Sequence, residues 1–237
     1  MEKIAVLQQM KREGRRIVGV VGWDTPTAQI AERAGVDFMS VGDSVGFNLW
    51  GRAEEDPVTI EEILLVCRAV RKGAGRMPVS CDIPSGHQGD PVAGAIRVAK
   101  EGGADMVKVL GTPEQVRAIV KAGVAVFAEF HGDHGNSEHL VEAARALEAA
   151  GAAMLDFRHS GPVAGPAVVK AVSIPVLGGM GGGPWLDGRV RLAHTAMGYG
   201  PKWLDSKADT YANTAKATLE AFRALADDVR GGRQIKG

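Results

Sequence analysis

The stretch Val36–Gly46, with the sequence VDFMSVGDSVG, decides the fold class. Its apolar run, Phe38–Val41, stops abruptly at Gly42, Asp43 and Ser44. A buried parallel strand that delivers polar groups to a site ends in this way. Because Gly-Asp-Ser is also ordinary turn chemistry, the stretch taken alone predicts either a simple turn or the edge of a site.

The segments on both sides of this stretch repeat its pattern. Short apolar runs alternate with helical segments that begin at Thr25, Thr59 or Thr112 and end near a glycine. Eight strand candidates predict a (β/α)8 barrel in one domain, residues 1–237, with an extra C-terminal helix over residues 205–229. A doubly wound open sheet is the alternative, but no G-x-G-x-x-G motif follows the first strand.

The composition excludes several classes of partner. The chain has 237 residues, with 28 Lys and Arg against 28 Asp and Glu, and therefore no formal net charge. Because it has no basic tract, we expect no nucleic-acid partner. No run approaches the roughly 20 apolar residues that span a bilayer, so we expect no membrane partner. The two cysteines, Cys67 and Cys81, lack metal-type spacing and predict a reducing, cytoplasmic location.

Polar side chains follow almost every predicted strand. The C-terminal ends of barrel strands share one face, so these residues are expected to converge although they are far apart in the sequence. Each one alone is equally well explained as a surface residue or a helix cap, but the whole set indicates a reaction site. The set comprises Asp24, Asp43, Ser44, Asp82, Lys108, Glu129, His131, Asp156, Arg158 and His194.

The carboxylates of this set predict a bound cation, because several carboxylates around one hollow repel each other unless a cation lies among them. Oxygen ligands favour Mg²⁺ or a similar hard divalent ion, with water and substrate completing the shell. Asp43 and Asp82 are the first ligand candidates, followed by Glu129 or Asp156. Lys108 is expected to neutralise charge or to bind a substrate carboxylate or keto oxygen. A Schiff base is the alternative, but acidic neighbours would keep the amine protonated.

Two further segments permit more than one interpretation. The segment Glu129–His134, EFHGDH, contains two histidines three residues apart, but its glycine predicts a substrate loop rather than a zinc-binding helix. The glycine run Gly178–Gly183 is typical either of an anion-binding loop or of a close-approach turn at the barrel mouth.

The motifs of the chain, in their order, resemble those of the ketopantoate hydroxymethyltransferase family, in the superfamily of phosphoenolpyruvate mutase and isocitrate lyase. The most specific match is Ala34–Ser44, AGVDFMSVGDS, followed by Gly51 and Pro57–Thr59. The further matches extend over essentially the whole chain: Gly22–Asp24 (family pattern T-x-Y-D), Asp82–Pro84 (D-M-P), Gly103–Lys108 (G-A-D-x-V-K) and Ile174–Gly188 (I-P-x-I-G-I-G-A-G…D-G-Q).

The resemblance implies a barrel, usually a homo-oligomer, in which Mg²⁺ holds a 2-oxo acid while an enolate forms and a carbon–carbon bond is made or broken. Asp43 and Asp82 match metal ligands of the family. Ser44 and Lys108 match residues that bind the keto acid. The one-carbon donor that the resemblance implies is methylene-tetrahydrofolate.

The chain departs from the family pattern in the proton-transfer half of the site. Leu110 stands where the family has a glutamate ligand, Glu129 falls at the histidine of the fifth strand, and Arg158 aligns with the glutamate taken as the base. A positioned base contributes roughly 10² to 10⁴ in rate, so its loss without a replacement would disable the reaction of the family. We therefore expect a different substrate or a different direction of the reaction. Glu129 is expected to replace the missing metal ligand, and Arg158 to clamp a second carboxylate. The candidates for moving the proton are Asp156, Glu129 and His131.

The sequence thus predicts a Mg²⁺-dependent aldolase, lyase or transferase that acts on a 2-oxo acid. The residues expected around the substrate are Asp24, Ser44, Lys108 and Arg158. One alternative is a true 3-methyl-2-oxobutanoate hydroxymethyltransferase that uses methylene-tetrahydrofolate. Another, of a different class, is a barrel that has lost catalysis and binds a small acid or a partner subunit.

Overall fold

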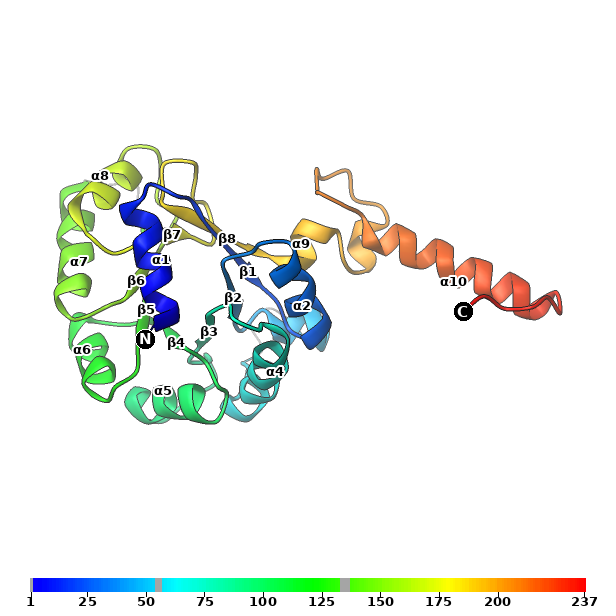
Figure 1. The fold of residues 1–237 in the computed structure, drawn as a ribbon, viewed down its shortest axis with the longest axis horizontal. Coiled ribbons are helices and arrows are strands. Elements are labelled where there is room, and N and C mark those ends of the chain that lie inside the picture. Colours follow the sequence, from blue (N-terminus) through cyan, green and yellow to red (C-terminus); the bar gives the residue numbers. More distant parts are fainter. Residues whose placement is uncertain (1, 54–56, 133–136) are drawn as a thin grey trace. The chain divides into compact units, whose positions relative to one another are not determined.

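Eight parallel strands form a closed barrel in the order in which they follow one another in the sequence (Figure 1). This confirms the predicted (β/α)8 fold class. The computed structural model describes all residues except 1, 54–56 and 133–136. The strands are β1 (Ile17–Val21), β2 (Phe38–Val41), β3 (Val79–Asp82), β4 (Met106–Leu110), β5 (Val126–His131), β6 (Met154–Arg158), β7 (Val176–Gly178) and β8 (Gly188–Leu192).

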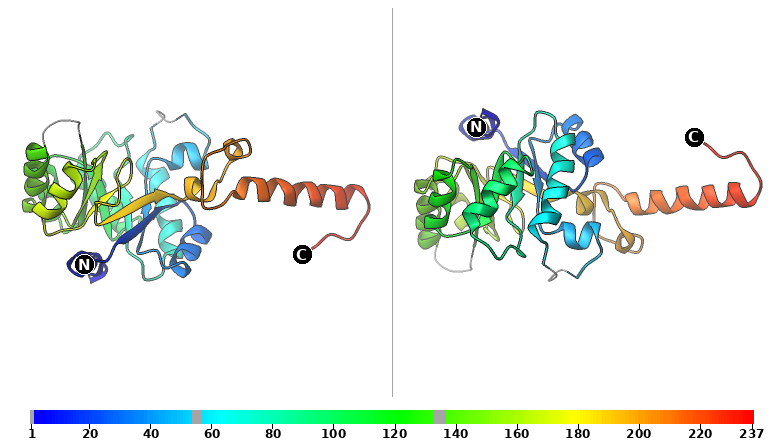
Figure 2. Two further views of the ribbon diagram at one scale, coloured as in Figure 1. Left: turned by 90° about the horizontal axis from the view of Figure 1, so that it is seen from above. Right: turned by 90° about the horizontal axis from the view of Figure 1, so that it is seen from below.

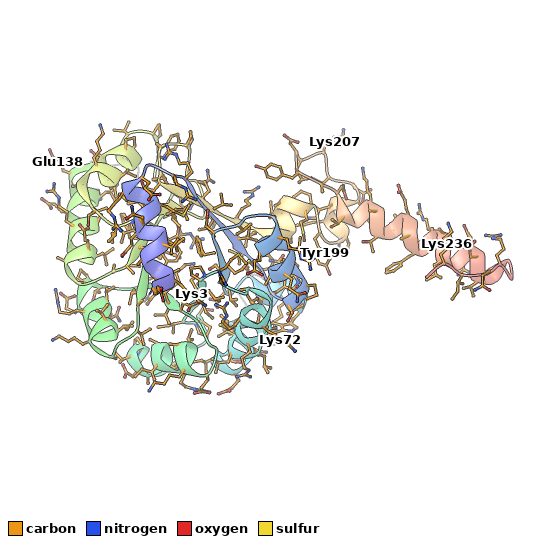
Figure 3. All side chains as sticks on the ribbon, in the orientation of Figure 1. Lys3, Lys72, Glu138, Tyr199, Lys207 and Lys236 are labelled. Atoms are coloured by element: carbon orange, nitrogen blue, oxygen red, sulfur yellow. The ribbon has the colours of Figure 1, made fainter. Side chains whose placement is uncertain are left out.

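Helices follow the strands and form the outer ring of the barrel (Figure 1). Charged side chains on this ring, such as Lys72 and Glu138, point to solvent (Figure 3). None of the helices in the described part of the chain combines the length and the apolar character needed to cross a membrane. The helices of the ring and its entry are α1 (Glu2–Arg12), α2 (Thr25–Arg33), α3 (Val45–Leu49), α4 (Ile60–Gly73), α5 (Pro91–Lys100), α6 (Pro113–Lys121), α7 (Ser137–Ala149) and α8 (Ala164–Ala171).

Two of the predicted helix starts, at Thr59 and Thr112, rest on capping boxes. Thr59 accepts a hydrogen bond from the N–H of Glu62, whose side chain accepts one from the N–H of Thr59. Thr112 and Gln115 make the same pair at the start of α6. Each pair satisfies two of the backbone N–H groups that a helix start leaves without an intrahelical partner. The sequence signal therefore gives the start of the helix in both cases.

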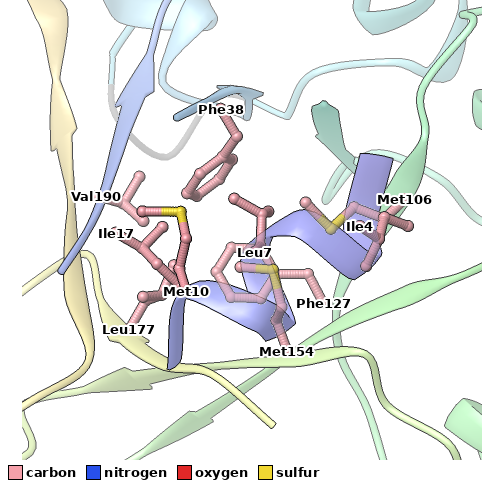
Figure 4. Packing of buried hydrophobic residues seen from close by; sticks show 10 residues of the cluster. All are labelled: Ile4, Leu7, Met10, Ile17, Phe38, Met106, Phe127, Met154, Leu177 and Val190. Atoms are coloured by element: carbon pink, nitrogen blue, oxygen red, sulfur yellow. The ribbon is translucent and has the colours of Figure 1, made fainter. Parts of the chain in front are cut away.

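Helix α1 closes the N-terminal end of the barrel, as Figures 2 and 4 show. Its buried residues Ile4, Leu7 and Met10 pack on side chains near the N-terminal ends of the strands. The rings of Phe38 and Phe127 meet edge to face there, with centroids 6.0 Å apart. The strand residues of this apolar layer are Ile17, Phe38, Met106, Phe127, Met154, Leu177 and Val190.

Above this apolar layer the interior of the barrel becomes polar. Successive side chains of a strand alternate between its two faces, so the residue two positions further on points the same way. On four strands that residue is polar: Ser40 after Phe38, Lys108 after Met106, Glu129 after Phe127, and Asp156 after Met154. Ser40 and Ser80 form a buried hydrogen bond of 2.8 Å in this position. The N-terminal end of the barrel interior is thus apolar, and the charged groups lie toward the C-terminal end of the strands.

The last part of the chain differs from the sequence prediction. Strand β8 ends at Leu192, so His194 lies in a short helix, α9 (Ala193–Met197), and not at a strand end as expected. The final helix α10 spans Thr214–Arg230 and does not begin at residue 205. Asn213 caps it by accepting a hydrogen bond of 3.0 Å from the N–H of Lys216.

The chain divides into two compact units, Met1–Arg191 and Leu192–Gly237. The first unit carries the barrel strands described above. The second contains α9, the 3-10 turn η1 (Pro201–Trp203) and α10. The expectation of a single folding domain over residues 1–237 stays a prediction beside this division.

Candidate active site

A lysine on β4 lies at the centre of the predicted site. The Nζ atom of Lys108 is 3.3 Å from both carboxylate oxygens of Asp82, 3.1 Å from Oε2 of Glu129 and 3.8 Å from Oδ2 of Asp156. These four residues come from the neighbouring strands β3 to β6. The structure therefore brings together four of the residues that the sequence placed at strand ends.

The three carboxylates determine the charge state of Lys108. Burial alone would lower the pKa of Lys108, but Asp82, Asp156 and Glu129 together raise it above its usual value. The amine is therefore protonated at physiological pH. A protonated amine does not attack a carbonyl group, so the site is suited to charge neutralisation or substrate binding and not to a Schiff base.

Glu129 joins Lys108 to two further side chains. Its Oε1 atom is 2.9 Å from Nε2 of His131 and accepts a hydrogen bond of 2.7 Å from Nη1 of Arg158. Burial opposes ionisation, but Lys108, His131 and Arg158 lower the pKa of Glu129 to about 2. An ionised carboxylate can only accept hydrogen bonds, so Nε2 of His131 carries the proton of their contact. A neutral His131 then holds its lone pair on Nδ1.

Asp43 and Asp82 each present a carboxylate oxygen without a hydrogen bond. Oδ2 of Asp43 accepts a hydrogen bond of 3.0 Å from the N–H of Ser85. Oδ1 of Asp43 and Oδ1 of Asp82 are buried, and neither accepts a hydrogen bond from a described residue. Lys108 lies within ion-pair distance of Asp82 Oδ1, but without hydrogen-bond geometry. Burial, with the charge of Asp43, raises the pKa of Asp82 to about 6 although Lys108 opposes this shift. Two such oxygens fit the ligand preference of a hard cation.

Gly42 keeps the space beside Asp82 open. A Cβ atom at position 42 would lie 2.6 Å from Oδ2 of Asp82, so the Asp82 carboxylate would have to shift. Within the described residues no group of three His, Cys, Asp or Glu side chains is arranged to hold a metal ion. A cation at Asp43 and Asp82 would therefore take its remaining ligands from water and substrate, as Mg²⁺ commonly does.

The other predicted residues have different surroundings. Asp24 caps α2, since its Oδ1 accepts a hydrogen bond of 2.7 Å from the N–H of Thr27. Asp156 is buried and accepts a hydrogen bond of 2.9 Å from the N–H of Gly179, while burial raises its pKa against the effect of Lys108. Ser44 follows Asp43 directly and makes no capping hydrogen bond to α3. The predicted alternative of a zinc site with His134 lies outside the described residues.

Several neighbours of the site are not indicated by any sequence pattern described above. The N–H groups of Ser85 and Gly179 hold Asp43 and Asp156, and no pattern in side-chain types announces a backbone donor. His159 follows β6, and its ring lies 6.4 Å from the ring of His131. Its position directly after the strand-end residue Arg158 is the one signal that indicates it.

Proteins of known family are similar to this chain over most of its length. Residues 2–132 and 129–234 match the model of the ketopantoate hydroxymethyltransferase family. A 3-methyl-2-oxobutanoate hydroxymethyltransferase of Cyanothece sp. is 34% identical over 96% of this chain and 95% of that protein. The enzyme of the same name from Geobacillus kaustophilus is 32% identical over 93% of this chain and 87% of that protein.

Solved structures share the fold at lower identity. Phosphoenolpyruvate phosphomutase from Streptomyces platensis superposes with a TM-score of 0.66 at 16% identity, covering 97% of this chain and 88% of that one. Phosphonopyruvate hydrolase, in a complex with oxalate and Mg²⁺, gives a TM-score of 0.62 at 19% identity, covering 98% and 89%. These likenesses concern the barrel fold alone. The match of the family model over nearly the whole length shows that the chain belongs to the ketopantoate hydroxymethyltransferase family.

Proposed function

We propose that the protein is a Mg²⁺-dependent enzyme that makes or breaks a carbon–carbon bond next to the carbonyl group of a 2-oxo acid. The observation that carries the proposal is the pair of buried carboxylate oxygens, Oδ1 of Asp43 and Oδ1 of Asp82, which accept no hydrogen bond from a described residue. Oδ1 of Asp82 also lies 3.3 Å from the ammonium group of Lys108. Family membership and the superfamily of the structural neighbours support the same class of chemistry.

Asp43 and Asp82 are the residues that would hold the divalent ion. Such an ion, when bound, supplies Lewis-acid stabilisation of the negative charge that develops on the keto oxygen. Glu129 was the third ligand candidate, but both of its oxygens already contact cationic or hydrogen-bonding side chains. We therefore assign Glu129 to the support of Lys108, His131 and Arg158.

Lys108 is the residue that we assign to the carboxylate or enolate oxygen of the substrate. Its ammonium group carries three hydrogen-bond donors, and it lies among carboxylates that keep it charged. The hydroxyl of Ser44, next to Asp43, is assigned to the same substrate group. Asp24 caps α2, and we give it no part in binding.

We assign the proton transfer to His131. Glu129 holds Nε2 of His131 and thereby directs the lone pair of Nδ1 away from itself. A carboxylate that fixes the tautomer of an imidazole base is a recurrent arrangement in enzymes. Asp156, the other candidate, is almost fully buried and held by Gly179, which makes it a poorer partner for a substrate carbon.

A second candidate function is 3-methyl-2-oxobutanoate hydroxymethyltransferase with methylene-tetrahydrofolate as the donor. It is favoured by the names of the relatives and by their coverage of nearly the whole chain. Two positions count against it, because the family resemblance implies an acidic residue at each. They are Leu110, which is 66% exposed at the end of β4, and Arg158 at the end of β6. Restored growth of a pantothenate-requiring bacterial strain that expresses this gene would support this candidate. Absence of growth although the folded protein is produced would count against it.

The third alternative, a barrel that binds a small acid without catalysis, makes a different prediction from both. It requires acid binding without exchange of substrate hydrogen.

Assembly as a homo-oligomer and a location in the cytoplasm are part of the proposal. The free, buried state of Cys67 and Cys81 is consistent with a reducing compartment.

The test is exchange of the C3 hydrogen of 3-methyl-2-oxobutanoate and 2-oxobutanoate in D₂O, followed by NMR, with calorimetric titration of Mg²⁺. We expect Mg²⁺-dependent exchange in the natural protein. Asp43→Asn should lose it by at least about 10²-fold, because the enolate loses its electrostatic support. Asp24→Asn is the matched control and should retain exchange. Full Mg²⁺-dependent exchange in Asp43→Asn would refute the assignment.

A further inference from the structure

His159 has an unusual backbone conformation at the edge of the site. With φ of +53°, it is the one non-glycine residue of positive φ among the described residues. Side chains other than glycine rarely adopt this region, and such residues gather at binding and catalytic sites. His159 directly follows β6 at the C-terminal end of the barrel, which is the reaction face of this fold.

Two segments of the chain, those after β5 and after β7, fit around His159. Its N–H donates a hydrogen bond of 2.7 Å to the carbonyl oxygen of Met180. A Cβ atom at Gly132 would lie 2.4 Å from the carbonyl oxygen of His159, and one at Gly181 would lie 2.8 Å from Nδ1 of its ring. The glycines after β5 and β7 thus leave room for both the backbone and the imidazole of His159. Its conformation is therefore determined by its neighbours and is not a loose loop geometry.

Arg158 contacts Glu129 directly, and the exposed imidazole of His159 lies near His131, which contacts the same carboxylate. The ring of His159 lies 6.4 Å from that of His131, which contacts Glu129. Arg158 uses Nη1 for Glu129, while Nη2 contacts the sulfur of Met180. A thioether is a weak acceptor, and the Met180 side chain is half exposed and flexible. An oxygen anion would be a far better partner for Nη2 than this sulfur.

We propose that Arg158 and His159 form a subsite for a second anionic group, so that the substrate is a 2-oxo acid with a second carboxylate. This inference rests on the proposed function, because it takes the 2-oxo acid end to lie at Lys108. One carboxylate, that of Glu129, separates Lys108 from Arg158 through contacts of 3.1 Å and 2.7 Å. The two cationic groups are thus close enough for one small dicarboxylate to reach both. Met180 would move aside when the second carboxylate binds.

The test compares two acids of equal chain length. 2-Oxoglutarate and 2-oxopentanoate differ only in the terminal group, which is a carboxylate in the first and a methyl group in the second. Calorimetric titration in Mg²⁺ should show tighter binding of 2-oxoglutarate by about tenfold or more, as expected for charged hydrogen bonds. 2-Oxosuccinate against 2-oxobutanoate gives the same comparison for a shorter acid.

The variants separate the subsite from the rest of the site. His159→Gly removes the ring and suits the positive φ, so it should reduce the preference for the dicarboxylate several-fold without strain. Arg158→Gln should reduce it further, and His139→Gln, on the exposed face of α7, should leave it unchanged. His159→Asn, which tolerates this conformation and keeps an N–H donor, should give an intermediate preference.

Three outcomes decide between the proposals. A dicarboxylate preference that falls in His159→Gly and remains in His139→Gln supports the subsite. Equal binding of both acids by the natural protein, or an unchanged preference in His159→Gly, overturns the subsite and leaves the proposed function standing. Absence of binding of any 2-oxo acid in Mg²⁺ overturns the proposed function, and the subsite with it.

Discussion

Replacement of Lys108 by methionine removes the one cation among the described residues that lies within 4 Å of Asp82, Glu129 and Asp156. Methionine has nearly the same length, so the change removes charge more than volume. Glu129 retains Arg158 as a partner at 2.7 Å, but no ion pair of the described residues joins Asp82 or Asp156 to another cation. The variant is therefore left with two carboxylates of low exposure, 19% and 5% for their side chains, that have lost their counter-charge.

The loss expected from this geometry is large. Removing one partner of a buried ion pair costs about 3–5 kcal/mol, and we expect about 3 kcal/mol since Glu129 stays paired. For a chain of this size, that corresponds to a fall in Tm of roughly 6–12 °C. The loss should shrink as the pH falls, because Asp82 and Asp156 take up protons and no longer require a cation. Mg²⁺ should also restore part of the stability, since it replaces the missing charge near Asp82.

Urea unfolding at pH 7.5 and pH 5, with and without Mg²⁺, measures all three effects. Lys72→Met is the control, because Lys72 is exposed on α4, and its change should stay within about 0.5 kcal/mol. A Lys108→Met protein as stable as the natural one at pH 7.5 would refute the description of Lys108 as the central counter-charge. So would a loss of stability that does not depend on pH.

Three further changes test other parts of the structure. Gly42→Ala places a Cβ atom 2.6 Å from Asp82 Oδ2, so calorimetry should show at least about tenfold weaker Mg²⁺ binding; unchanged affinity would contradict the proposed metal site. Leu7→Ala, at 1% exposure in the apolar layer, should cost about 2–5 kcal/mol in urea unfolding while leaving ligand affinity unchanged. The pKa of Asp82 is raised from 3.8 to about 6 in the fold, so the Mg²⁺-free protein should lose stability as the pH rises through this window, by up to about 3 kcal/mol. Asp82→Asn should lack this loss, and an identical pH profile in the two proteins would contradict the shift.

The order of strands and helices follows directly from sequence patterns. The apolar run Phe38–Val41, which ends in polar residues, predicts β2 to the residue, since buried parallel strands carry this pattern. Capping boxes give the starts of α4 and α6. The short helix α3 was missed because five residues give no recognisable period. The start of α10 was misplaced although Asn213, a good capping residue, precedes its apolar stripe.

The convergence of the candidate residues was predictable from the sequence, but the pairings among them were not. Placement of Asp82, Lys108, Glu129 and Asp156 at strand ends needs only the fold rule. Which carboxylate meets which cation depends on the stagger between strands, such as the register that sets Asp82 beside Lys108 and Glu129 beside Asp156. Asp24 shows the opposite case, because a strand-end carboxylate serves as a helix cap. The space for His159 depends on Gly132 and Gly181, which lie more than 20 residues away in the sequence.

The apolar layer at the base of the barrel has a consequence for how this chemistry can diversify. Phe127 and Met154 fill the base, while Glu129 and Arg158, for which the family resemblance implies other residues, lie further up the same strands. Exchange of an upper residue leaves the apolar packing below it intact, so its cost is confined to the polar contacts of the upper layer. Reactive groups near the C-terminal ends of the strands can therefore be replaced while the apolar layer at the base of the barrel stays unchanged.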